Sequence, residues 1–283
     1  MYTYNIIYLD NLHFPCPRRS SGRGFLFRRL MQRFKIIIAY DGTDFFGWQI
    51  QPNQISITSC LQESFYKIFK HQISILGASR TDTGVHALGQ VAQFFSDLPL
   101  PEEIIMNAWN AGLPNSIVIR DLKRVSDNFH PCQNVTQKIY YYHLFLKRPL
   151  PFVARYGWLY KFIDQVDLEK FNKGLQLYIG EHDFASFCKV EPEKATVRTI
   201  DSITVQKLSH WSMLRVTIKG KSFLRHQIRR MVGYALDVAR RENLPVHYLQ
   251  EVLESKNPQQ TLLKADGSGL CLRKVFYEPK FSQ

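Results

Sequence analysis

The sequence has few cysteines and no long apolar run. Its 283 residues include five cysteines, each at least 44 residues from the next, and no Cys-x-x-Cys pair. This spacing argues against a structural zinc site and a disulfide framework, and it favours a reducing compartment, here expected to be the cytoplasm. Aliphatic runs such as Ile36-Ile37-Ile38 fall far short of the about 20 residues of a membrane span. We therefore expect neither an integral membrane protein nor a secreted disulfide scaffold.

Acidic residues are scarce relative to basic ones, and the imbalance is local. The chain has 37 Lys and Arg against 24 Asp and Glu, a formal net charge of +13. Residues 1–33 carry a net charge of +5 and residues 215–241 one of +7, which is nearly all of the excess. Clustered arginine is typical of proteins that bind a phosphate backbone. A solvated helix face with a charged tail, or an acidic membrane surface, would account for the same charge.

The predicted elements indicate three segments and an α+β fold. Residues 1–33 mix proline, glycine and serine with arginine, and we interpret them as a basic, poorly ordered extension. Two lobes follow, over residues 34–137 and 138–283. Apolar periodicity predicts strands at 34–40, 72–76, 89–96, 116–125, 138–147, 197–206, 212–219 and 269–277. It predicts helices at 58–70, 101–113, 167–179, 223–240 and 245–255. Strands and helices alternate unevenly, as in α+β proteins.

The segment around Asp82 holds the strongest candidate for chemistry. Asp82 lies between two threonines, two residues after Arg80 and two before Gly84. A tight turn there would expose the carboxylate, and a neighbouring arginine would keep it ionised. An ionised, oriented aspartate can act as a nucleophile or a general base. An aspartate that merely stabilises a β-turn would give the same short pattern.

Asp82-Thr83-Gly84 also suggests an aspartic protease. Such a site needs two carboxylates that share a proton, and this chain has no second Asp-Thr-Gly. Only a dimer that paired two copies of the motif could supply the second carboxylate. Arg80 would oppose proton sharing, and the net charge of +13 would have no role.

Arg80-Thr81-Asp82-x-Gly84-Val85-His86-Ala87 resembles the active-site motif of the tRNA pseudouridine synthase A family. Further motifs of that family follow in its order: Tyr40-Asp41-Gly42-Thr43-x-Phe45-Phe46-Gly47-Trp48-Gln49-x-Gln51, Gly89-Gln90-Val91, Phe129-His130 with Lys138-Ile139-Tyr140-Tyr141-Tyr142, His182-Asp183-Phe184-x-Ser186-Phe187, and Gly220-x-x-Phe223-x-x-His226-x-x-Arg229-x-Met231-Val232-Gly233. The resemblance runs from about Phe34 to Tyr277. It implies the pseudouridine synthase fold, in which two α+β lobes share a mostly antiparallel sheet with helices packed on it and a central basic cleft.

The resemblance also implies a function. Members of the family are isomerases that convert uridine to pseudouridine at positions 38, 39 and 40 of the tRNA anticodon stem-loop. They work as homodimers, without a cofactor or a metal. A non-catalytic RNA-binding module of the same fold is the alternative, although it leaves the complete set of site residues unexplained.

By the same resemblance, Asp82 matches the catalytic nucleophile, which attacks either the uracil ring or the ribose C1′. Tyr140 matches the residue that stacks on the target uracil and is a candidate base, since stacking helps to hold a flipped base. Arg229 matches the partner of the catalytic carboxylate, and Arg80 the residue implicated in base flipping. RNA contacts are expected at Phe129, His130, Arg148, Arg225 and Arg230.

Two segments depart from the family pattern. Cys132 stands where a basic residue is usual, which puts one phosphate contact in doubt. Ala265-Asp266-Gly267-Ser268-Gly269-Leu270 replaces a proline-rich approach to the last strand, which puts the shape of the pocket in doubt.

Overall fold

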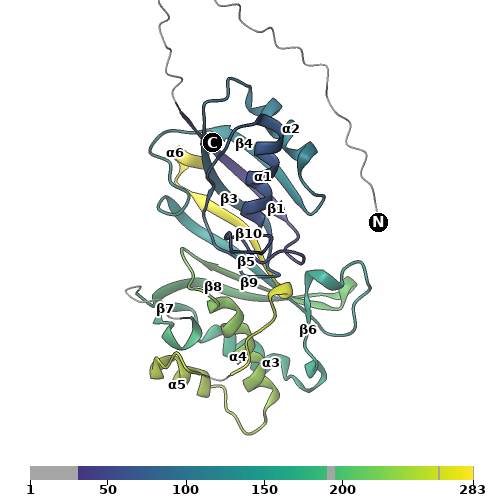
Figure 1. The fold of residues 1–283 in the computed structure, drawn as a ribbon. Coiled ribbons are helices and arrows are strands. Elements are labelled where there is room, and N and C mark those ends of the chain that lie inside the picture. The colour runs from purple at the N-terminus through teal and green to yellow at the C-terminus, as the bar shows by residue number, and fades with distance from the viewer. Residues whose placement is uncertain (1–30, 190–194, 261, 283) are drawn as a thin grey trace, which may run out of the picture. The chain divides into compact units, whose positions relative to one another are not determined.

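The computed structural model describes residues 31–189, 195–260 and 262–282 (Figure 1). The strands are β1 (Gln32–Tyr40), β2 (Leu76–Gly77), β3 (His86–Ser96), β4 (Ile117–Arg124), β5 (Val135–Phe145), β6 (Trp158–Leu159), β7 (Gly180–Asp183), β8 (Val197–Leu208), β9 (Met213–Gly220) and β10 (Leu270–Tyr277). The α-helices are α1 (Ile57–Phe69), α2 (Glu102–Gly112), α3 (Leu168–Gln176), α4 (Gln227–Arg240), α5 (Tyr248–Ser255) and α6 (Pro279–Ser282).

All described strands belong to one sheet. Its path is β4-β1-β3-β10-β5-β9-β8-β7, with β2 paired to β3 and β6 paired to β5. The strand pairs are antiparallel except β3–β10 and β5–β6, which are parallel. The last strand of the chain, β10, thus lies between β3 and β5 and joins the first half of the sheet to the second (Figure 1). The predicted α+β fold with a shared, mostly antiparallel sheet is confirmed.

The helices bury apolar stripes on this sheet. Trp109 of α2 is fully buried against Phe65 of α1 and Phe94 of β3, and its indole N–H donates to the Leu61 carbonyl at 3.1 Å. On the other half of the sheet α3 and α5 pack on α4, the most deeply buried of these three helices. Met231, Val232 and Ala235 of α4 are buried in the core.

Most predicted ends lie within three residues of the observed ones, and three predictions differ for an identifiable physical reason. The strand expected at 72–76 is reduced to β2, because most of that stretch makes no ladder hydrogen bonds. The basic helix starts at Gln227 rather than at Phe223, because His226 has a left-handed φ of 68° and the chain turns before it. Of the predicted extension, residues 1–30 lie outside the described residues, whereas Gln32 and Arg33 already belong to β1. The lobe boundary at residues 137 and 138 stays a prediction.

Candidate active site

A cleft of about 1040 Å³ collects the side chains that the sequence singled out. Its walls come from the Asp82 segment, from β5, from the turn before α4 and from the loop before β10. Asp82, Arg80, Tyr140 and Arg229 all line it, although they lie up to 149 positions apart in the chain. The sheet order explains this meeting, because β10 pairs on one side with β3, which follows the Asp82 turn, and on the other side with β5, which carries Tyr140.

The backbone before Asp82 is held residue by residue. Lys138 donates from Nζ to the Ala78 carbonyl at 2.7 Å, and the Gln90 amide bonds both the N–H and the carbonyl of Ser79. The Tyr40 hydroxyl lies 2.8 Å from Thr81 Oγ1. These contacts come from β5, β3 and β1, so side chains of three strands hold the backbone just before Asp82 and thereby position it.

Two glycines allow the turn itself. Gly47 has a φ of 82° and lies so close to Thr81 and Asp82 that a Cβ atom would collide with their backbone. Gly84 has a φ of 75°, a conformation that glycine adopts without a steric penalty. The Val85 N–H closes the turn on the Asp82 carbonyl at 3.2 Å.

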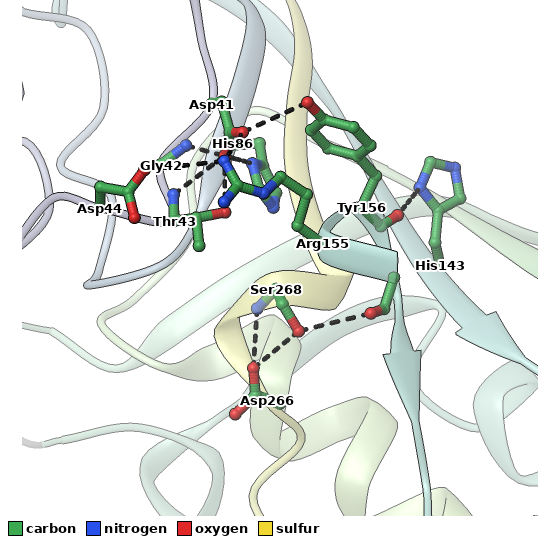
Figure 2. Close-up of polar contacts among 11 residues, drawn as sticks. Asp41, Gly42, Thr43, Asp44, His86, His143, Arg155, Tyr156, Asp266 and Ser268 are labelled. Atoms are coloured by element: carbon green, nitrogen blue, oxygen red, sulfur yellow. Dashed lines mark hydrogen bonds and ion pairs between the residues drawn. The ribbon is translucent and has the colours of Figure 1, made fainter. Parts of the chain in front are cut away.

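A polar network around Asp41 includes His86, which follows the Asp82 turn in the chain (Figure 2). The Gly42 N–H donates to Nδ1 of the buried His86 at 3.1 Å, and burial lowers the pKa of His86, so this imidazole is neutral. Burial alone would raise the pKa of Asp41, but hydrogen bonds from Thr43 and Arg155 outweigh it and the pKa is lowered. The network ties the loop after β1 to the segment before β6.

Asp82 is paired with a cation inside the cleft. Arg229 donates from Nη1 to Asp82 Oδ2 at 2.9 Å, and its Nε donates to the Ala265 carbonyl at 2.9 Å. His226 Nε2 lies 3.6 Å from the same oxygen. The pKa of His226 falls to about 4, mainly through burial, against the opposing effect of Asp82. Within the described residues no second carboxylate pairs with Asp82, so the dyad of an aspartic protease does not form within the chain.

Tyr140 lines the same cleft and is almost fully buried. Its ring meets Phe223 edge-on with centroids 5.1 Å apart. Burial raises the pKa of Tyr140 to about 12, so the phenol is protonated at neutral pH in the free protein. A protonated phenol suits stacking and hydrogen-bond donation, and it is a poor base in this state.

Of the residues expected to contact RNA, Arg225 and Arg148 are exposed, whereas Phe129 is buried. Arg225 is exposed and lines the cleft. Arg148 is exposed on the loop after β5, away from the residues that line the cleft. Phe129 is fully buried against Tyr277 and Phe281, so its side chain cannot reach an RNA and the expected contact there is wrong.

Two further residues have structural contacts that the sequence did not reveal. The Nδ1 atom of His130 accepts the N–H groups of Cys132 and Gln133, which makes the imidazole a local cap. Arg230 is half-buried, donates from Nη1 to the carbonyls of Cys188 and Ser186, and is not among the residues that line the cleft. The RNA contact expected of Arg230 stays a prediction.

Sequence reasoning missed several cations of the cleft. These are Lys138, Lys189, Arg198 and Lys264. Lys138 lies two residues before Tyr140 on β5, and period-two alternation would have placed both side chains on one face. The other three lie outside any motif, and only the folded chain brings them to Asp82.

The chemistry of the cleft defines a class of protein. Among the described residues, seven Lys and Arg side chains line the cleft against two carboxylates, Asp82 and Asp266, so it fits a phosphate-rich substrate. The paired aspartate among them fits an enzyme with a carboxylate nucleophile or base. The site is therefore that of an enzyme acting on nucleic acid.

The sequence model of one family matches the chain at residues 36–133 and 175–278, with the description tRNA pseudouridine synthase. The chain belongs to this family and is thus an isomerase of uridine in tRNA, as the motifs predicted. The tRNA pseudouridine synthase A of Thermodesulfovibrio yellowstonii is 36% identical over 257 residues, covering 87% of this chain and 100% of that relative. That of Thermosipho africanus is 38% identical over 248 residues, with the same coverage.

Similarity to solved structures is weaker. The archaeal box H/ACA sRNP Nop10–Cbf5 complex matches with a TM-score of 0.32 at 10% identity, covering 87% of this chain and 49% of that chain. This score is too low to bear on the site. No helix in the described part of the chain is both long and apolar enough to cross a membrane.

Proposed function

We propose that the chain converts uridine to pseudouridine at positions 38, 39 and 40 of the tRNA anticodon stem-loop, with Asp82 as the nucleophile. The observation that carries this proposal is the Asp82–Arg229 pair in a cleft lined mainly by cations. The uridine is flipped into the cleft, and Asp82 attacks at the uracil ring or at the ribose C1′. The N1–C1′ glycosidic bond breaks, the uracil turns, and C5 forms the new bond to C1′. The bond between Asp82 and C1′ or the uracil ring breaks again and frees the carboxylate, C5 loses its proton to water, and N1 takes up a proton, so the product is an isomer of the substrate.

The other site residues take supporting roles in this proposal. Tyr140 stacks on the target uracil, and its protonated phenol favours stacking over proton removal. Arg80, exposed at the cleft two residues before Asp82, fills the space that the flipped uridine leaves. Arg229 holds one carboxylate oxygen, Oδ2, so that Oδ1 can face the substrate.

Tritium release from tRNA labelled at uridine C5 tests the reaction. Isomerisation must release this tritium, because C5 loses its hydrogen when it bonds to C1′. We expect release by the wild type, and none by Asp82→Asn, which keeps the size of the side chain but loses its charge. Asp127→Asn removes an exposed carboxylate outside the cleft and should release tritium at the wild-type rate.

The same assay separates the alternative function. A non-catalytic RNA-binding module would bind tRNA and release no tritium with the wild type. Undiminished release by Asp82→Asn would instead exclude Asp82 as the nucleophile. Family membership does not favour the non-catalytic alternative.

The assembly and location of the protein are proposed on the family resemblance. We expect a cytoplasmic homodimer in which one tRNA contacts both subunits. Light scattering of the purified chain should give twice the mass of 33.2 kDa. A monomer at the concentration of the activity assay would contradict the dimer without affecting the chemistry.

A further inference from the structure

The loop before β10 holds a lysine rigidly beside the Asp82–Arg229 pair. The Ala265 N–H donates to the Arg229 carbonyl at 3.0 Å, and Arg229 Nε returns a bond to the Ala265 carbonyl. Gly233 of α4 lies so close to this loop that a Cβ atom would collide with the Leu263 carbonyl. Lys264 lies between these two anchors, so its backbone is fixed against the start of α4, and its side chain lines the cleft.

Lys264 lies among like charges. Burial lowers the pKa of Lys264, and the positive charges of Arg229, Arg230 and Arg225 lower it further, while Asp82 acts in the opposite direction. His226 senses the same cations, because Lys264, Arg229 and Arg225 all contribute to its lowered pKa. The lowered pKa values of Lys264 and His226, which lie on different segments, both indicate that positive charge is concentrated beside Asp82.

Few carboxylates among the described residues lie near these cations. Oδ2 of Asp82 is already bonded by Arg229. Asp266, the other described carboxylate of the cleft, accepts the N–H and the hydroxyl of Ser268 through Oδ1. In the described residues no hydrogen bond or salt bridge joins the side chain of Lys264 or Arg225 to another protein group. Asp82 offsets the repulsion between the cations only in part, because the pKa values of Lys264 and His226 stay lowered, and a bound anion would relieve it further.

We propose that Lys264 and Arg225 form a phosphate subsite, which binds a backbone phosphodiester of the RNA beside the target uridine. This inference rests on the proposed function for the identity of the anion. Lys264 directly precedes residues 265–270, the segment that departs from the family pattern. A phosphodiester there would be held next to the nucleophile while the paired carboxylate stays available for reaction.

The salt dependence of tRNA binding tests the subsite. Each lost phosphate contact should reduce the slope of log K against log salt by about 0.7–0.9. We expect this reduction for Lys264→Ala and again for Arg225→Ala, with KM raised and the rate at saturating tRNA nearly unchanged. Lys264→Arg should restore the wild-type slope. Lys207→Ala, at an exposed lysine of β8 outside the cleft, is the matched control and should leave the slope unchanged.

An NMR titration of His226 tests the premise without RNA. Removing a neighbouring positive charge should raise the pKa of His226 in Lys264→Ala relative to the wild type. An unchanged His226 titration, or a wild-type salt slope in Lys264→Ala, would overturn the subsite. If the wild type released no tritium from tRNA, the proposed function would fail first. Normal tritium release with an unchanged slope would overturn the subsite alone.

Discussion

Arg229→Met is the most informative single change at the site. Arg229 spans two directions, with Nη1 on Asp82 and Nε on the Ala265 carbonyl. The side chain of Arg229 is 12% exposed and that of Asp82 21%, so methionine would leave a largely buried carboxylate without its partner. Breaking such a pair costs about 3–5 kcal/mol when one partner is removed. If half or more of this reaches the transition state, the rate falls by roughly 10–4000-fold, at about 1.4 kcal/mol for each factor of ten.

Arg229→Lys separates charge from geometry in the same experiment. A lysine keeps the positive charge, but one ammonium cannot bond in both directions as the guanidinium does. A hydrogen bond to a charged group is worth about 1.5–3 kcal/mol, so we expect a loss of roughly 10–150-fold, smaller than in Arg229→Met. Single-turnover tritium release at saturating tRNA is the measurement, because it excludes changes in binding. A rate within threefold of the wild type for Arg229→Met would refute the view that this pair orients Asp82.

The remaining predictions concern packing, turn geometry and pH. Phe129→Ala should lower the free energy of unfolding by about 3–5 kcal/mol, measured by urea titration, while the salt slope of tRNA binding stays that of the wild type. Gly47→Ala should lower the melting temperature more than Gly84→Ala, because only at Gly47 would the new Cβ meet backbone within collision distance. Burial and the neighbouring Arg215 lower the pKa of His143 to about 4, so the unfolded chain binds the extra proton between pH 6.5 and 4. Stability should therefore fall as pH drops through this window, and His143→Gln should flatten that fall in urea titrations at pH 5 and 7.

Much of the fold could be read from local pattern. The long strands and helices lie close to their predicted ranges, because the spacing of apolar residues along the chain shows which positions share one face of a strand or helix. The predicted strand at 72–76 was wrong because this apolar alternation has no partner strand over most of its length. A strand needs a neighbour to pair with, and the segment's own sequence does not contain that neighbour. The predicted start of α4 was wrong because the left-handed conformation of His226 leaves no periodic signal in the sequence.

The sequence by itself determined the family, the reaction and the identity of Asp82, Tyr140, Arg80 and Arg229 as site candidates. Each of these residues lies in a short motif of neighbouring residues, which can be recognised without the fold. Tertiary structure decided which charges face the substrate cleft. It buried Phe129 and brought Lys264 to the cleft of Asp82 across 182 positions of sequence. The physical reason is the insertion of β10 between β3 and β5, which joins the two halves of the sheet. Burial and charge pairing depend on these long-range neighbours, and no short segment contains them.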